Sequence, residues 1–100
     1  MTYGDLTLNF EETSTYVKDR VLDMGQVEFK ILNCLIKHQG SLVDRKLLHS
    51  FIWGEHIPSE RALDPHINSL RKKLRHSVCD LKTVYGKGFS LIITQGKDAF

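Results

Sequence analysis

The side chains best suited to binding a ligand lie between residues 61 and 76, where lysine and arginine are concentrated. Apolar residues recur in this segment at helical spacing and form a narrow stripe, made of Leu63, Ile67, Leu70 and Leu74. The opposite face of such a helix is polar and basic, and it carries Arg61, Pro65, Asn68, Ser69, Lys72 and His76. One side of the helix is therefore expected to pack on a core, while the other presents a surface suited to a polyanion.

Positive charge is unevenly distributed along the chain. Residues 1–50 hold six Lys/Arg against seven Asp/Glu, whereas residues 51–100 hold eight against five. The densest part is the run Arg71-Lys72-Lys73-Leu74-Arg75. A run of this kind is often only a solvated helix surface. By helical angle Lys72 points most directly away from the core, while Arg71 and Arg75 lie nearer its edge, where they would suit phosphate groups.

The remaining reactive residues favour packing over chemistry. Cys34 and His38 have the spacing of two metal ligands, but both fall on an apolar helix face, so core packing is the preferred interpretation. Cys34 and Cys79 form no C-x-x-C pair and are expected to be reduced thiols. Glu28 is expected to be neutralised by helix capping or by a basic partner such as Arg45. His66 is equally compatible with a contact to a phosphate group and with a contact to the first helix.

Enzyme function is not supported by any motif. The sequence contains no G-x-x-x-x-G-K-[ST], G-x-S-x-G or H-E-x-x-H pattern, so neither a catalytic residue nor a cofactor or metal is expected. It also lacks a signal-peptide pattern and an apolar run of about 20 residues, so a cytoplasmic location is expected and a membrane partner is not.

The elements that must position these residues follow from periodicity and capping. Short strands are expected at Asp5–Asn9, Ser14–Lys18 and Arg20–Asp23, and the first helix at Gln26–Gln39, with Gly25 as N-cap and Glu28 in its capping box. A second helix begins after Asp44 and ends at Trp53-Gly54. Its apolar side is formed by Leu47, Leu48, Phe51 and Ile52.

The start of the third helix is open, because Pro65 removes a hydrogen bond in mid-helix. The favoured alternative is a start near Ser59 with a distorted first turn. The other is a start at Pro65 after an Asp64 cap. Strands at Leu81–Val84 and Phe89–Ile93 flank Tyr85-Gly86-Lys87-Gly88 and form a hairpin with a basic tip, and residues 96–100 are expected to fray.

These elements predict one α+β domain over residues 1–100, a winged helix-turn-helix with an N-terminal antiparallel sheet, three helices and a C-terminal hairpin wing. B-DNA's major groove accepts one α-helix, and an adjacent hairpin can reach the backbone or the minor groove.

The motifs also resemble a known family, the OmpR/PhoB-type effector domains of bacterial two-component response regulators. Residues 24–32 are similar to the family pattern L-T-x-x-E-F-x-L-L. The second-helix pattern R-x-x-L-L followed by W-G is met by Arg45, Leu47, Leu48, Trp53 and Gly54, with the arginine one residue closer to the leucines than expected. The pattern R-x-x-D-x-H-I-x-x-L-R-x-K-L falls on Arg61, Asp64, His66, Ile67, Leu70, Arg71, Lys73 and Leu74. The wing pattern T-V-x-G-x-G-[FY] falls on Thr83, Val84, Gly86, Gly88 and Phe89.

The resemblance covers residues 5–92 and implies sequence-specific binding of double-stranded promoter DNA. It implies a four-stranded N-terminal sheet, a recognition helix over about residues 60–76 in the major groove and a wing at residues 85–88 over the minor groove. The expected DNA-binding residues are Arg61, Pro65, His66, Asn68, Ser69, Arg71, Lys72, Arg75, Tyr85 and Lys87. The expected RNA polymerase contacts lie in the loop after the second helix, at Trp53, Glu55, His56 and Ile57.

The same resemblance implies a homodimer on tandem half-sites about one helical turn apart, and a receiver or sensor domain in the full-length protein. The chain departs from the family at positions where arginine is common, which hold Asn68, Ser69 and Tyr85. Asn68 is hypothesised to read adenine, and Pro65 to pack against a thymine methyl group. The alternative is a winged helix that contacts a protein and has little DNA affinity.

Overall fold

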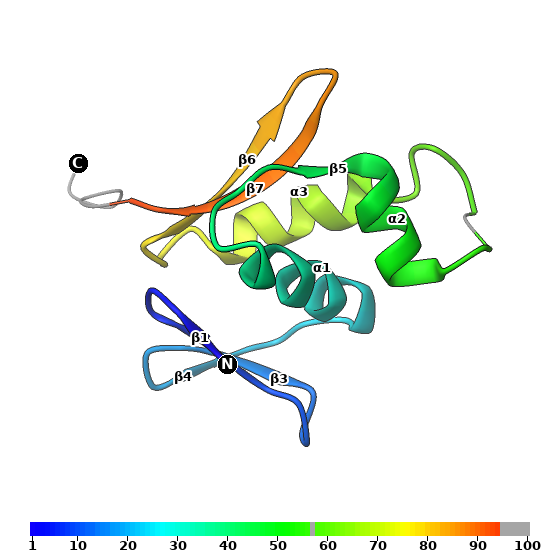
Figure 1. Ribbon diagram of the computed structural model, residues 1–100. Coiled ribbons are helices and arrows are strands. Elements are labelled where there is room, and N and C mark those ends of the chain that lie inside the picture. Colours follow the sequence, from blue (N-terminus) through cyan, green and yellow to red (C-terminus); the bar gives the residue numbers. More distant parts are fainter. Residues whose placement is uncertain (57, 95–100) are drawn as a thin grey trace.

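Figure 1 shows the computed structural model, which describes residues 1–56 and 58–94. Helix α1 crosses the middle of the molecule, with one small sheet on one side and the other helices and the wing on the opposite side. Two expectations, the polymerase contact at Ile57 and the frayed end at residues 96–100, lie outside the described residues.

The N-terminal sheet has four antiparallel strands in the order β1-β2-β3-β4. They are β1 (Thr2–Tyr3), β2 (Leu6–Asn9), β3 (Ser14–Val17) and β4 (Arg20–Leu22). The alternation of Leu6 and Leu8, both buried, places one face of β2 on the core. Strand β1 is too short to give a periodic signal and was not expected from the residues, although the family resemblance implied four strands.

Helix α1 (Gln26–Lys37) is the central element and is buried along most of its length. Its start matches the expected cap, because the Gly25 backbone N–H donates to Glu28 Oε1 at 3.0 Å. It ends at Lys37, two residues before the expected Gln39. The next residue, His38, forms a hydrogen bond between its ring Nδ1 and the Cys34 carbonyl at 2.8 Å. Cys34 is a buried free thiol, and in the described residues no group of His, Cys, Asp and Glu could hold a metal. The contact of His38 with a backbone carbonyl supports the packing interpretation of this pair.

Helix α2 (Arg45–Trp53) begins as expected, with the Asp44 carboxylate accepting from the Leu47 N–H at 2.7 Å. Its buried residues are Leu48, His49 and Ile52, whereas Leu47 and Phe51 are exposed. The expected apolar face is therefore confirmed for Leu48 and Ile52 and wrong for Leu47 and Phe51, because the apolar run is wider than the contact with the core.

Helix α3 (Asp64–Lys73) starts later than the favoured alternative, so that prediction was wrong. Residues 60–63 form turns with hydrogen bonds from the Ala62 N–H to Ser59 and from the Asp64 N–H to Arg61. Pro65 lies in the first helical turn, where its missing N–H costs nothing, and Leu63 rather than Asp64 is the N-cap. The recognition helix is accordingly shorter than residues 60–76, although Leu63 and Leu74 stay buried beyond its two ends.

The wing belongs to a second antiparallel sheet, ordered β5-β7-β6. The hairpin strands are β6 (Cys79–Val84) and β7 (Gly88–Ile93), and the unexpected third strand is β5 (Val43–Asp44), which lies directly before α2. Val43 pairs with Phe89 and Asp44 with Gly88. A Cβ atom at Gly88 would lie 2.2 Å from the Val43 carbonyl oxygen, so only glycine allows this close approach.

The core is a single cluster of apolar side chains contributed by both sheets and all three helices. The two sheets are also joined directly, because the Tyr3 hydroxyl donates to the Leu91 carbonyl at 2.7 Å. Asp5 accepts from the Ser77 hydroxyl at 2.5 Å and from the Val78 N–H at 3.1 Å. Across the described helices, none is both long and apolar enough to span a membrane.

Candidate nucleic-acid interface

An exposed stripe runs along the outer side of α3 and of the turns at its two ends. Its members are spaced by three or four residues, and all are solvent exposed: Arg61, Pro65, Asn68, Lys72 and Arg75. We call these five residues the outer stripe. Its three cations form no ion pair with any residue that the structure describes. Positive charge and a free amide are therefore available to an external ligand along the whole helix.

Two other expected DNA-binding residues of α3, His66 and Ser69, are only half-buried and lie beside the stripe rather than on it. The Ser69 side chain lies near the Glu28 carboxylate of α1 and helps to lower the pKa of that group. Ser69 therefore lies between the exposed face of α3 and the contact of α3 with α1.

Arg71 is exposed but is fastened to the wing. Its Nε donates to the Leu81 carbonyl at 3.2 Å, and its Nη2 donates to the Thr83 hydroxyl at 2.7 Å. Both acceptors belong to β6, so this side chain bridges the recognition helix and the wing.

Lys73 points in yet another direction, towards α1. Its ammonium lies 2.8 Å from Glu28 Oε1, and the Glu28 side chain is only 7% exposed. Burial alone would raise the pKa of the Glu28 carboxyl, but the hydrogen bonds from Lys73 and Gly25, together with the nearby Ser69 side chain, outweigh it and lower that pKa. The expected basic partner of Glu28, Arg45, was wrong: the helix crossing brings α3, not α2, to the start of α1.

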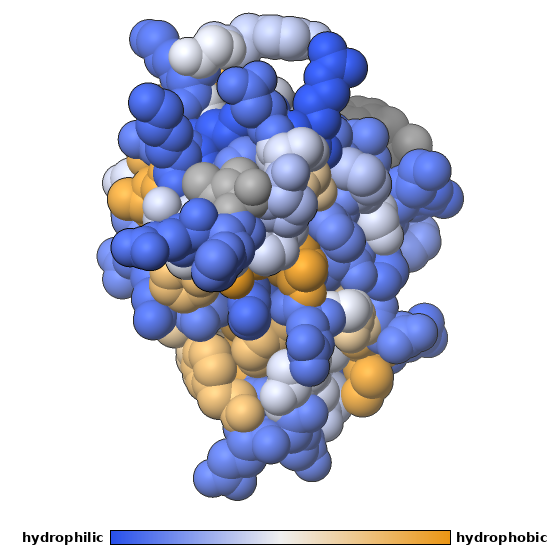
Figure 2. Space-filling model, turned by 90° about the vertical axis from the view of Figure 1, so that its right-hand side faces the viewer, coloured by the Kyte–Doolittle hydropathy of each residue, from blue (hydrophilic) through white to orange (hydrophobic). Residues whose placement is uncertain are grey.

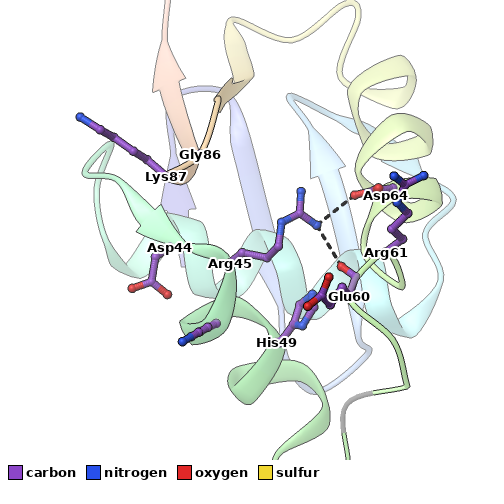
Figure 3. A pocket seen from close by; sticks show the side chains of 9 residues that line it. Asp44, Arg45, His49, Glu60, Arg61, Asp64, Gly86 and Lys87 are labelled. Atoms are coloured by element: carbon purple, nitrogen blue, oxygen red, sulfur yellow. Dashed lines mark hydrogen bonds and ion pairs between the residues drawn. The ribbon is translucent and has the colours of Figure 1, made fainter.

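Arg45 instead organises the start of α3. Its guanidinium lies 3.0 Å from Asp64 Oδ1, donates to the Glu60 carbonyl at 3.2 Å and stacks over the Phe89 ring at 5.1 Å. Figure 3 shows this side chain at the centre of a pocket between α2, the turn before α3 and the wing tip, with dashed lines to Asp64 and Glu60. The contacts hold α3 and the wing in one arrangement around α2.

His49 lines the same pocket and is the site residue that sequence reasoning missed. It is 5% exposed, its Nε2 has no hydrogen-bond partner among the described residues, and its ring packs edge-on against Trp53. Burial, with Arg45 nearby, lowers the pKa of the imidazole. Counted from Arg45, the R-x-x-L-L pattern fits Leu48 and His49 without any shift, so the spacing contained the signal: a histidine occupies the second leucine position.

The wing tip is fully open to solvent. Tyr85 is 97% exposed, and Lys87 beside it is also exposed. The turn is closed by a hydrogen bond from the Lys87 N–H to the Val84 carbonyl at 3.0 Å, and Gly86 adopts a φ of 72°. A phenol ring is thus displayed at the position where members of the family that the sequence resembles often carry arginine.

The loop after α2 has a buried root and polar, exposed residues beyond it. Trp53 is half-buried against the core, whereas Glu55 and His56 are exposed. Figure 2 looks at the side of the molecule that carries α2 and this loop. Its upper half is mostly hydrophilic, and apolar atoms form separate patches lower down.

A basic helix with an exposed outer face, packed on two other helices and followed by a β-hairpin, defines the winged helix-turn-helix class of DNA-binding domains. The comparison of sequences agrees, because residues 18–91 match the family described as "Transcriptional regulatory protein, C terminal". The chain therefore belongs to this family, the OmpR/PhoB-type winged-helix effector domains of response regulators.

Curated relatives include the transcriptional regulatory protein CpxR homolog of Haemophilus influenzae, 32% identical over 92% of this chain and 42% of the relative. The phosphate regulon transcriptional regulatory protein PhoB of Klebsiella pneumoniae is 40% identical over 71% of this chain and 32% of the relative. The chain thus spans less than half the length of either relative.

Solved structures share the fold. The DNA-binding domain of CpxR from E. coli superposes with a TM-score of 0.81 at 28% identity, over 94% of this chain and 96% of that chain. The Klebsiella pneumoniae RstA DNA-binding domain, solved in complex with the RstA box, has a TM-score of 0.78 at 26% identity, over 92% of this chain and 95% of that chain. The α+β winged-helix architecture expected from the sequence is confirmed.

Proposed function

We propose that this chain binds double-stranded promoter DNA sequence-specifically, as the effector domain of a bacterial transcriptional response regulator. The observation that carries the proposal is the outer stripe of α3. It offers the Asn68 amide and three cations that form no ion pair with a described residue, on a helix of the right width for a major groove. The complex of the related RstA domain with its DNA box supports the same activity.

We assign the residues of the outer stripe to two roles, contacts with DNA phosphates and contacts with DNA bases. Arg61 and Arg75 at its ends suit phosphate groups, which orient a protein without specifying bases. Between them Pro65, Asn68 and Lys72 face the groove. An asparagine amide can donate to adenine N7 and accept from its N6 amino group, and a proline ring can pack against a thymine methyl. This combination favours a half-site with A·T pairs at its centre.

The wing gives a second contact, with Tyr85 and Lys87 over the adjacent minor groove. An arginine there is attracted by the strong negative potential of a narrow groove, whereas a neutral phenol is not. Tyr85 is expected instead to contact the groove wall and accept or donate one hydrogen bond. The chain should therefore depend less on A-tract narrowing than an arginine-tipped wing.

The wider assembly is proposed by analogy with the family. The exposed residues Glu55 and His56 of the loop after α2 would contact RNA polymerase, and two copies would bind tandem half-sites. A receiver or sensor domain would account for the part of the relatives' length that this chain does not cover. No enzymatic activity is proposed, and the protein would act in the cytoplasm, where promoter DNA lies.

The test is selection of bound sequences from a random duplex library at moderate salt. Enrichment of one short motif, alone or repeated one helical turn apart, is the expected result. A matched library bound by a variant with Asn68→Ala and Lys72→Ala should lose the enriched bases while retaining weak binding. Failure of the wild-type chain to enrich any motif would overturn the proposal in favour of a winged helix that contacts protein.

A further inference from the structure

The wing of this protein is held from two sides, and near its tip the β6 side is tied to α3 by Arg71. On the β7 side, β5 pairs with it and Arg45 lies over Phe89. Strand β6 is the edge strand of the sheet, and among the described residues no further strand pairs with it. The tie on this side is Arg71, through the Leu81 carbonyl and the Thr83 hydroxyl.

The position of this tie matters because it is close to the wing tip. Thr83 pairs with Phe89, and only one further pair, Val84 with Gly88, separates it from the exposed turn. Arg71 itself lies on α3 between Asn68 and Lys72 in the sequence, so it joins the helix of the outer stripe to the hairpin one residue pair before the turn. Two donors of one planar guanidinium fix an angle as well as a distance.

We propose that Arg71 is a positioning residue that fixes the wing relative to α3, and so sets where Tyr85 lies when the outer stripe occupies the major groove. This inference rests on the proposed DNA binding for its consequence, but the tie itself exists in the free protein. It replaces the phosphate contact that the sequence suggested, because two of the Arg71 nitrogens already donate to β6.

The first test measures amide hydrogen exchange of the free protein. Arg71→Ala and Thr83→Val each remove the short hydrogen bond, whereas Thr83→Ser keeps the hydroxyl and serves as the matched control. Exchange at the wing end of the β6–β7 ladder should accelerate by roughly 2- to 10-fold in the first two variants, the range for one net hydrogen bond. It should stay unchanged in the control, and amides of α1 should not respond. Equal rates in all four proteins would overturn the proposal.

The second test measures coupling on the selected duplex. If Arg71 acts through the wing, Tyr85→Ala should weaken binding several-fold less in an Arg71→Ala background than in the wild type. In a Lys72→Ala background the Tyr85 effect should be unchanged. Thr83→Val should weaken binding without changing its salt dependence, because no charge is lost.

The opposite pattern identifies a phosphate contact and overturns the inference: additive effects of Arg71 and Tyr85, with Arg71→Ala reducing the slope of log K against log salt by about 0.9. If the wild-type chain binds no duplex, the proposed function fails, and the exchange experiment alone still decides whether Arg71 fixes the wing.

Discussion

The salt dependence of DNA binding follows from counting the cations that face outward. Arg61, Lys72, Arg75 and Lys87 are exposed on the proposed DNA side and form no ion pair with a described residue. Counting one neutralised phosphate for each of these four cations, with Lys72 acting from within the groove, predicts a slope of about −3.6 for log K against log salt. This slope corresponds to roughly a 150-fold loss of affinity per protomer between 50 and 200 mM.

Replacing one of these cations should change the slope by a fixed amount. Arg75→Ala is expected to bring it to about −2.7, so that the same salt increase weakens binding only about 40-fold. The substitution should not affect folding, because Arg75 is exposed and lies after the end of α3. Arg20→Ala is the matched control: it removes an exposed arginine from β4, in the sheet that Figure 1 shows on the far side of α1 from the wing.

Fluorescence anisotropy titrations of a labelled selected duplex at four or five salt concentrations give both slopes. A wild-type slope weaker than about −1 would refute the count of phosphate contacts. A slope that changes as much with Arg20→Ala as with Arg75→Ala would refute the assignment of these contacts to the α3 face.

Further predictions concern residues inside and outside this face. Lys73→Ala should lower the free energy of unfolding by about 2–3 kcal/mol in urea titrations, because it leaves the buried Glu28 carboxylate without its cation. Since the pKa of Glu28 is lowered in the folded state, its contribution is complete above pH 4.5 and lost as the pH falls further. Glu28→Gln should therefore flatten the acid limb of the stability profile. Asn68→Ala should relax base preference at one position of the selected motif, by about 1–3 kcal/mol, and an unchanged motif would contradict adenine reading. Tyr85→Arg should steepen the salt slope by about 0.9 and shift selection towards A-tracts beside the half-site. His49→Leu should raise thermal stability by about 1 kcal/mol, because the buried Nε2 lacks a described partner. It should also remove the loss of stability as the pH falls below 6.5, since the pKa of His49 is lowered in the folded state.

Much of the fold could be predicted because local signals and family motifs agreed. The start of α1 at Gln26 and the Asp44 cap of α2 follow from short-range chemistry, and both were confirmed. The errors occurred where tertiary contacts decide. Leu47 and Leu48 are equally apolar, so apolarity alone does not show which is buried, and only the spacing of the family pattern from Arg45 points to Leu48.

The individual directions of the basic residues could not be predicted for a similar reason. The sequence shows Arg71, Lys72 and Lys73 as one run, but in the structure they contact the wing, solvent and α1 respectively. A helical angle gives the side from which a side chain leaves, whereas the partner that it meets depends on long-range packing. Strand β5 was missed because two residues contain no periodicity.

The pairing of Val43 with Phe89 also has a kinetic consequence. The two residues close a loop of chain that contains both α2 and α3, and this pair is one of the longest-range contacts in the wing sheet. Closing such a loop lowers the conformational entropy of the chain before the packing contacts of the enclosed helices can compensate for the loss. We expect α2, α3 and the wing to form together in a single late cooperative step, with the tight fit at Gly88 among the last contacts made.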